Sequence, residues 1–394
     1  MSEIKVVVSY GMGVDSTALL LRWIFEPETR PAPWRDVLVV TAMTGDEYPR
    51  TGELVERHIL PLFREHGVRY AQVARGGQFA ADGIVVLDDS RRPQRVHLYD
   101  GPWSLGGEMR AAGTVPQVGG TRLCSIHSKG EVIDAFVAGQ ADGPYLHVLG
   151  FEAGEAGRAA KDSAHNTETR TGVYPLIGWN WDRPACAAYI RERTGEDWPK
   201  SCCTFCPFAL TSAEGPHRAL DLYAGRPQAA VDALLMEHTA RSLNRRQGLA
   251  GDDAFLAGLL AADPRQETAL QDFARALDEA QWRLYEVRRA WVPAKKDPAK
   301  TRSLRSLRSL GSGSRAAMSA ALHREAAGRN ADIDAPDGIS RAWVLRRGST
   351  RKVKVVPDAE HLLVAAPAGA ADKQRDDFEA AFAFAVANRP PALF

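Results

Sequence analysis

The sequence predicts an α/β fold, an open parallel sheet with helices on both faces. Three observations support this prediction. Short β-branched runs alternate with stretches of helical periodicity, a glycine-rich turn follows the first run, and no apolar run is long enough to span a membrane. The predicted strands are Ile4–Ser9, Asp36–Thr41, Val68–Val73 and Tyr145–Gly150, and the predicted helices are Ser16–Phe25, Arg50–His66, Lys129–Val137 and Arg183–Arg193.

The length and composition of the chain predict several globular parts. It has 394 residues, of which 45% are apolar and 25% are charged. Ser-Leu-Arg recurs near residue 305 and Gly-Ser-Gly-Ser follows, which predicts a flexible linker. We expect a ligand-binding domain with a cysteine cluster over 1–215, a helical region over 216–292, the flexible linker over 293–315 and a small basic module over 316–394.

Two further features concern loops and location. Residues 76–123 and 151–172 show little periodicity and are predicted to be loops, the second of them over the ligand site. The N-terminus has no signal-peptide pattern, so a cytoplasmic location without a membrane partner is expected. The five cysteines are then expected to be reduced, and Cys186, on the predicted helix that begins at Arg183, is expected in the core.

The most informative stretch is Ser-Tyr-Gly-Met-Gly-Val-Asp-Ser-Thr over residues 9–17, between the first strand and the first helix. Its glycines allow a tight turn in which backbone N–H groups converge, and the helix N-terminus favours negative charge. The turn lacks Gly-Lys-Ser/Thr and is therefore not a lysine-bearing P-loop. A nucleotide phosphate is the ligand that this arrangement predicts.

The cysteines predict a metal centre. Cys203 and Cys206 have the Cys-x-x-Cys spacing with which two thiolates bind one centre, and Cys124 would supply a third thiolate from another loop. Three thiolates hold a 4Fe–4S cluster and leave one iron open, with Cys202 as a further candidate ligand. Zinc, bound by these three with Cys202 or His127, is one alternative, and unligated thiols are another.

The turn at 9–17 resembles the pyrophosphate loop of the ATP pyrophosphatase superfamily, whose usual form is Ser-Gly-Gly-x-Asp-Ser. Asp15 and Ser16 match this form, as does Gly13. Gly11 stands where serine is usual, and Met12 stands where the first glycine is usual.

Three further motifs extend the resemblance over roughly residues 4–210. Their order and spacing are similar to those of the phosphoadenosine phosphosulfate reductase-like family, and most of all to its phage- and DNA-modification-type branch. The motifs are Arg-Leu-Cys-Ser-Ile-His-Ser-Lys at 122–129, Tyr-Pro-Leu-Ile-Gly-Trp at 174–179 and Lys-Ser-Cys-Cys-Thr-Phe-Cys-Pro-Phe at 200–208.

The resemblance implies the adenine nucleotide alpha hydrolase fold and an enzyme that adenylates its substrate with ATP and Mg²⁺. It further implies sulfur transfer, as thiolation or phosphorothioation, to nucleic acid or a nucleotide. The iron–sulfur centre would take part in that step, with a sulfur donor such as a cysteine desulfurase. The implied ATP-binding residues are Ser9, Gly11, Gly13, Asp15, Ser16, Thr17, Asp46, Gly150, Glu155 and Arg158, and the implied catalytic residues are Asp15, Arg122 and Lys129.

Two other functions stay open. A sulfonucleotide reductase of this family uses a cysteine in a C-terminal tail, but no cysteine follows Cys206, so that Cys202 would have to be the nucleophile. A non-catalytic ATP sensor or nucleic-acid-binding partner protein would bind ATP without splitting it, which the departures at Gly11 and Met12 allow.

The basic segment 295–354 predicts a nucleic-acid partner. It carries 15 lysines and arginines against five acidic residues. Basic side chains beside an aromatic ring suit a nucleic-acid backbone. The alternative is a solvated linker followed by a basic surface strand. The ring is that of Trp343, and its basic neighbours are Arg341, Arg346, Arg347, Arg351, Lys352 and Lys354.

Overall fold

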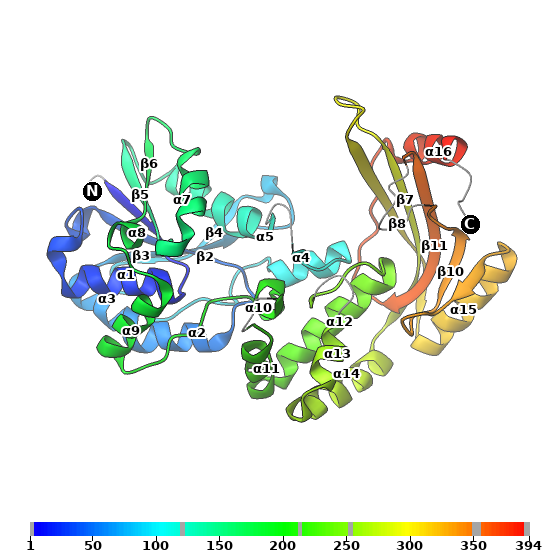
Figure 1. The fold of residues 1–394 in the computed structure, drawn as a ribbon, viewed down its shortest axis with the longest axis horizontal. Helices are drawn as coiled ribbons and strands as arrows, with labels where there is room; N and C mark the ends of the chain where they lie inside the picture. The colour runs from blue at the N-terminus through cyan, green and yellow to red at the C-terminus, as the bar shows by residue number, and fades with distance from the viewer. Residues whose placement is uncertain (1–3, 119–122, 212–214, 251–254, 349–355, 390–394) are drawn as a thin grey trace. The chain divides into compact units, whose positions relative to one another are not determined.

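The computed structural model describes residues 4–118, 123–211, 215–250, 255–348 and 356–389. The chain forms two compact units (Figure 1). Unit 1 comprises Met1–Glu108 and Gly119–Thr204, and unit 2 comprises Met109–Val118 and Phe205–Phe394.

Unit 1 is built on a six-stranded sheet of order β4-β3-β2-β1-β5-β6. All neighbouring strands run parallel except β4, which lies antiparallel to β3 at one edge. The predicted α/β class with a mostly parallel sheet is therefore confirmed. The strands are β1 Val6–Ser9, β2 Val37–Met43, β3 Arg69–Arg75, β4 Ile84–Ser90, β5 Tyr145–Leu149 and β6 Arg170–Val173.

The central strands β1 and β2 are almost continuous apolar runs because both faces of the sheet are covered there. Val6 and Val8 of β1 point into one core layer and Val7 points into the other, as the two-residue period of a strand requires. The first layer contains residues of α1 Val14–Phe25, α3 Leu60–His66 and α9 Arg183–Thr194, and the second contains residues of α6 Glu131–Val137.

The predicted helix 50–66 is interrupted. The chain forms α2 Pro49–Leu54, then a π-helical turn over Val55–Ile59, and then α3. Pro61 at the start of α3 has no N–H to donate to the preceding turn, which accounts for a break at this place.

The predictions of loops at 76–123 and 151–172 are wrong in part. The first segment contains β4 and α4 Leu105–Ala112, and the second contains α7 Ala156–Ser163 and β6. β4 is an edge strand with exposed valines at 85 and 86, and β6 has only four residues including a glycine. Neither strand therefore carries the alternating apolar pattern by which a strand is recognised.

Unit 2 contains a five-stranded antiparallel sheet of order β8-β7-β11-β10-β9. The strands are β7 Trp282–Pro293, β8 Thr301–Gly313, β9 Asp332–Asp334, β10 Arg341–Leu345 and β11 Asp358–Pro367. The helices are α10 Pro207–Thr211, α11 Gly215–Gly225, α12 Pro227–Leu243, α13 Leu256–Ala261, α14 Glu267–Glu279, α15 Arg315–Gly328 and α16 Phe378–Asn388. Helices α15 and α16 both pack on the sheet (Figure 1).

The structure corrects the predicted linker at 293–315 and the end of the predicted helical region at 292. Residues 282–293 form β7, and residues 301–313 form β8, paired with β7 along its length. The Ser-Leu-Arg repeat does not show the two-residue period of a strand with one buried face. Its period of three places successive leucines on opposite faces of β8, so the repeat resembles a low-complexity segment. Leu304 packs in one cluster with Phe378 of α16, whereas Leu307 packs in another with Tyr285.

No helix within the described ranges has the length and apolarity that crossing a membrane requires.

The packing of β8 predicts a stability effect that a flexible linker would not show. Leu307 is 1% exposed, so Leu307→Ala should lower the free energy of unfolding of unit 2 by about 2–5 kcal/mol. Ser303→Ala on the same strand changes an exposed side chain and should have an effect within about 0.5 kcal/mol. Urea unfolding followed by circular dichroism measures both, and an unchanged Leu307→Ala variant would support a linker instead.

Candidate functional site

A cavity of about 950 Å³ lies in unit 1. Its wall includes Ser9, the last residue of β1, Leu149, the last residue of β5, and Thr41 near the end of β2. Open parallel sheets place ligands at the carboxyl ends of their strands, and this volume is at the upper end of the range for a ligand pocket.

Residues from separate sequence motifs line this one cavity. The predicted site residues in its wall are Ser9, Gly11, Gly13, Asp15, Ser16, Lys129, Gly150, Glu155 and Arg158. Within the described part of unit 1, Thr17, Asp46, Cys124 and Cys203 do not line it. Arg122 lies outside the described residues.

The turn between β1 and α1 is held tightly. Met12 has a φ of 57°, the left-handed conformation that glycine usually supplies, and its side chain is buried in the core. Its carbonyl accepts a hydrogen bond of 3.0 Å from Nε1 of Trp198. A Cβ at Gly13 would lie 2.7 Å from Oγ of Ser201, so a side chain here would require Ser201 to move.

The N-terminus of α1 offers hydrogen-bond donors to the cavity. Gly13 precedes the helix and provides no side-chain cap, and the first intrahelical bond runs from the Thr17 N–H to the Gly13 carbonyl. The amides before Thr17 therefore have no acceptor within the helix. Val14, Asp15 and Ser16, which carry these amides, all line the cavity.

Gly150 brings β5 against this helix terminus. A Cβ on Gly150 would lie 2.9 Å from both N and Cα of Ser16, closer than side chains approach a backbone. The end of β5 and the first turn of α1 can therefore be this close only with glycine at residue 150.

The charged side chains of the cavity form pairs. Asp15 accepts hydrogen bonds from Nε and Nη2 of Arg183, at 3.2 and 2.9 Å. Burial raises the pKa of Asp15, and the hydrogen bond from Arg183 lowers it less than burial raises it. Glu155 accepts a hydrogen bond of 2.6 Å from Arg158, whose guanidinium carbon also lies 4.4 Å from the centre of the Phe151 ring.

A neutral histidine lies at the middle of β5. Nδ1 of His147 accepts a hydrogen bond of 2.9 Å from Arg170, so its proton is on Nε2, which donates to Oγ of Ser9 at 2.8 Å. Burial, followed by the charge of Arg170, lowers the pKa of His147 to about 4. Asp162 forms an ion pair of 2.9 Å with Arg170 and so completes this chain of polar contacts.

A buried carboxylate joins the cavity to the cysteine-bearing segments. Glu47 is 1% exposed and lies 3.5 Å from Nζ of Lys129, five residues after Cys124. Glu47 also forms an isolated β-bridge with Cys203, whose Sγ lies 3.5 Å from Oγ1 of Thr44. The segments that carry two of the predicted cysteines therefore meet at one acidic side chain.

The predicted metal centre stays a prediction. Among the described residues, no group of three or more His, Cys, Asp or Glu side chains is arranged to hold an ion. We therefore derive no chemical step through an iron–sulfur cluster or zinc. Cys186 is buried as predicted, and burial raises the pKa of its thiol to about 12.

Two predicted ATP contacts have other partners. The Thr17 side chain is fully buried, and its hydroxyl lies 3.2 Å from the hydroxyl of Tyr10. Asp46 accepts a hydrogen bond of 2.6 Å from the Gly106 N–H. Both side chains thus stabilise the surroundings of the cavity and are not part of its wall.

Several charged and polar residues of the cavity wall were not among the predicted site residues. A histidine in an otherwise apolar strand was the available signal for His147, because strands buried on both faces seldom carry polar side chains. Arg183 was visible only as the start of a predicted helix. Glu47, Arg170 and Lys200 also line the cavity. Arg170 lies in the segment predicted to cover the ligand site and Lys200 begins the motif at 200–208, but none of the three was predicted to be a site residue.

Comparisons of the chain with protein-family models, with curated proteins and with solved structures found no match.

The low pKa of His147 predicts a pH-dependent stability of unit 1. Between about pH 6.5 and 4 the unfolded chain binds a proton at this histidine and the folded chain does not, so the free energy of unfolding falls as the pH falls. The full contribution is up to roughly 3 kcal/mol.

His147→Gln should remove this part of the pH dependence, whatever its effect at neutral pH. The exposed His66 provides the control variant, His66→Gln, which should retain the wild-type slope. Urea unfolding at half-unit steps from pH 4.5 to 7.5 tests both, and equal slopes for all three proteins would contradict a buried neutral His147.

Proposed function

We propose that unit 1 binds ATP in this cavity and splits it between the α- and β-phosphates, so that a substrate oxygen is adenylated and pyrophosphate leaves. The observation that carries this proposal is the convergence of residues 9–16, Lys129 and residues 150–158 on one cavity at the ends of parallel strands. Each of these segments belongs to a separate motif of the sequence, and the fold brings all three to one cavity.

The phosphates would lie at the N-terminus of α1. The unpaired amides of Val14 to Ser16 and the Ser16 hydroxyl supply hydrogen bonds there, and the helix dipole favours the negative charge. Gly150 leaves room for this approach because no side chain covers the Ser16 amide.

Cations around the cavity would balance the charge that develops as pyrophosphate leaves. Arg158, Arg183, Lys129 and Lys200 line the wall. Each arginine has five N–H donors, of which the pairs with Glu155 and Asp15 occupy only some. Preorganised cations of this kind stabilise a transition state without rearranging, which is the usual basis of such catalysis.

The Asp15 carboxylate has a different function here from binding a metal ion. Both of its oxygens accept hydrogen bonds from Arg183, so it orients that guanidinium toward the phosphates. Mg²⁺ would accompany ATP, and we assign it no protein ligand.

The departure from the usual loop at Met12 does not argue for a non-catalytic sensor. Its backbone has the conformation that glycine would have, and its side chain is buried in the core rather than placed over the cavity. The sulfur-transfer step, its cysteine desulfurase donor and the nucleic-acid acceptor stay predictions from the sequence.

A matched pair of glycine variants tests the nucleotide site. Gly150→Ala places a methyl group 2.9 Å from the Ser16 amide and should weaken ATP binding at least tenfold, or about 1.4 kcal/mol. Gly157→Ala on α7 meets no atom within 4 Å and should bind ATP as the wild type does. Titration calorimetry of the full chain measures both.

The products identify the reaction. Radiolabelled ATP, incubated with the protein and with DNA or RNA as candidate acceptors, should release pyrophosphate and leave AMP bound to the acceptor, or free where water displaces it. ADP and phosphate would contradict cleavage between the α- and β-phosphates, whereas tight binding without any product would favour the sensor. Equal ATP affinities of the two glycine variants would remove the turn at 9–17 from the site.

A further inference from the structure

A second hollow, in unit 2, is lined mainly by arginines. It has a volume of about 90 Å³ and lies where the end of α12 meets strands β7, β10 and β11. Its wall consists of Asn244, Arg245, Arg246, Arg289, Trp343, Arg346, Arg347, Glu360 and Leu362. Three of its arginines lie outside the basic segment 295–354. The hollow therefore forms only when the fold brings these arginines to that segment.

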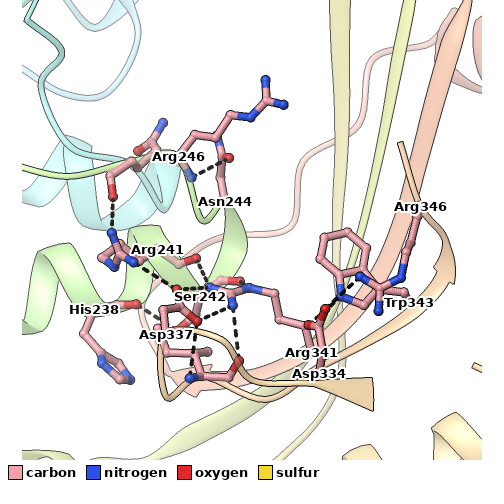
Figure 2. Close-up of polar contacts among 12 residues, drawn as sticks. His238, Arg241, Ser242, Asn244, Arg246, Asp334, Asp337, Arg341, Trp343 and Arg346 are labelled. Atoms are coloured by element: carbon pink, nitrogen blue, oxygen red, sulfur yellow. Dashed lines mark hydrogen bonds and ion pairs between the residues drawn. The ribbon is translucent and has the colours of Figure 1, made fainter. Parts of the chain in front are cut away.

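Arginines of the sheet fix the position of the α12 terminus. Arg341 is 1% exposed, and its guanidinium donates to the carbonyls of Arg241 and Ser242 at 2.7 and 3.2 Å. It also pairs with Asp337, which accepts a hydrogen bond from Arg241 as well (Figure 2). Arg289 donates to the next carbonyl, that of Leu243, at 2.6 Å.

The residues that follow α12 are therefore held against the strands. Asn244 ends the helix, its side-chain oxygen accepts from the Arg246 N–H at 3.2 Å, and Arg245 lies between them. On the facing strand, Trp343 donates to Asp334 at 2.8 Å, and the same carboxylate accepts from Arg346 at 2.7 Å (Figure 2). The hollow is thus bounded by rigid elements.

The residues that line the hollow carry more positive than negative charge. Glu360, the one acid among the nine lining residues, already pairs with Arg289 at 2.5 Å. The guanidinium carbons of Arg346 and Arg245 lie 5.0 and 6.0 Å from the centre of the same Trp343 ring. Arg245 forms no ion pair with any carboxylate of the described residues. Arg346 already pairs with Asp332 and Asp334, and Arg347 pairs with Asp358, so Arg245 is a cation here that a bound anion would neutralise.

We propose that this hollow binds a phosphate group. Guanidinium groups hold phosphate oxygens by paired N–H donors, and they are less strongly hydrated than ammonium groups. The hollow is small, about 90 Å³, which suits a compact anion such as a phosphate group. Trp343 is 7% exposed and cannot stack on a base, so its ring serves only to position Arg245 and Arg346.

The phosphate has two sources, a free phosphate ion or the phosphodiester backbone of a nucleic acid, and the test separates them. Inorganic phosphate is titrated into the full chain in a calorimeter, and a fluorescein-labelled 12-nucleotide single-stranded DNA is titrated by anisotropy, both at 50 mM salt. Arg245→Gln should weaken whichever ligand binds by threefold to tenfold. For the DNA, it should also reduce the slope of log affinity against log salt concentration by about one unit.

A matched control separates this effect from a general loss of charge. Arg275, on α14, is 64% exposed and pairs only with its neighbour Asp272 among the described residues, so Arg275→Gln removes the same charge elsewhere in unit 2. It should change either affinity by less than twofold. Arg245 is exposed and forms no ion pair in the described chain, so the unfolding temperature of Arg245→Gln should stay close to that of the wild type.

Each outcome decides the proposal. Binding of phosphate assigns a free ion to the hollow. Binding of DNA that millimolar phosphate does not displace assigns the backbone. No binding of either ligand, or equal effects of the Arg245 and Arg275 variants, would overturn the proposal. Arg245 and Arg275 both belong to unit 2, so phosphate bound at the N-terminus of α1 in unit 1 would be the same in both variants, and failure here leaves the ATP site unaffected.

Discussion

The close approach of β5 to the first turn of α1 is the constraint on which the candidate site depends. Gly150 and the Ser16 backbone are in contact at a distance that no side chain at residue 150 would allow. This contact leaves the unpaired amides of the helix terminus open to the cavity. The tight turn at Met12 and Gly13, fixed by Trp198 and Ser201, holds the other side of the same helix terminus.

Charge pairing explains how such a site is stable without a ligand. Asp15 with Arg183, Glu155 with Arg158, and Glu47 with Lys129 each place an acid beside a cation in the cavity wall. Because each cation keeps donors that its acid does not use, a phosphate can bind without breaking the pairs. His147 contributes hydrogen bonds without charge, since its low pKa keeps it neutral at physiological pH.

The hollow in unit 2 carries a larger excess of cations, although Arg289, Arg346 and Arg347 there also pair with carboxylates. Arginines converge there with few acids in the wall, although the scaffold behind them is fully paired through Arg341 and Asp337. Elsewhere in the basic segment, the arginines of β8 form structural ion pairs, such as Arg302 with Asp377 and Arg308 with Glu286. A count of basic residues along the sequence therefore overstates the surface that is open to a polyanion.

The sequence predicted four of the five parallel strands of unit 1, β1, β2, β3 and β5, because each is mainly apolar, and it predicted the turn at 9–17 from its glycines. It did not predict the strand β8, because a period of three resembles neither a strand nor a helix, although both faces of β8 bury leucine. It also missed Arg183 and Arg170, because their place in the cavity depends on contacts between residues far apart in the chain. The prediction that Thr17 belongs to the site is wrong by one residue. Ser16 lines the cavity, whereas the side chain of Thr17 is buried in the core.

Hydrogen–deuterium exchange with and without ATP tests the central claim most directly, because it reports on the amides themselves. The account predicts that ATP slows the exchange of the amides of residues 13–16 and of those near Gly150, and leaves β8 in unit 2 unchanged. ATP binding that leaves the exchange of residues 13–16 unaltered would contradict a phosphate site at the N-terminus of α1.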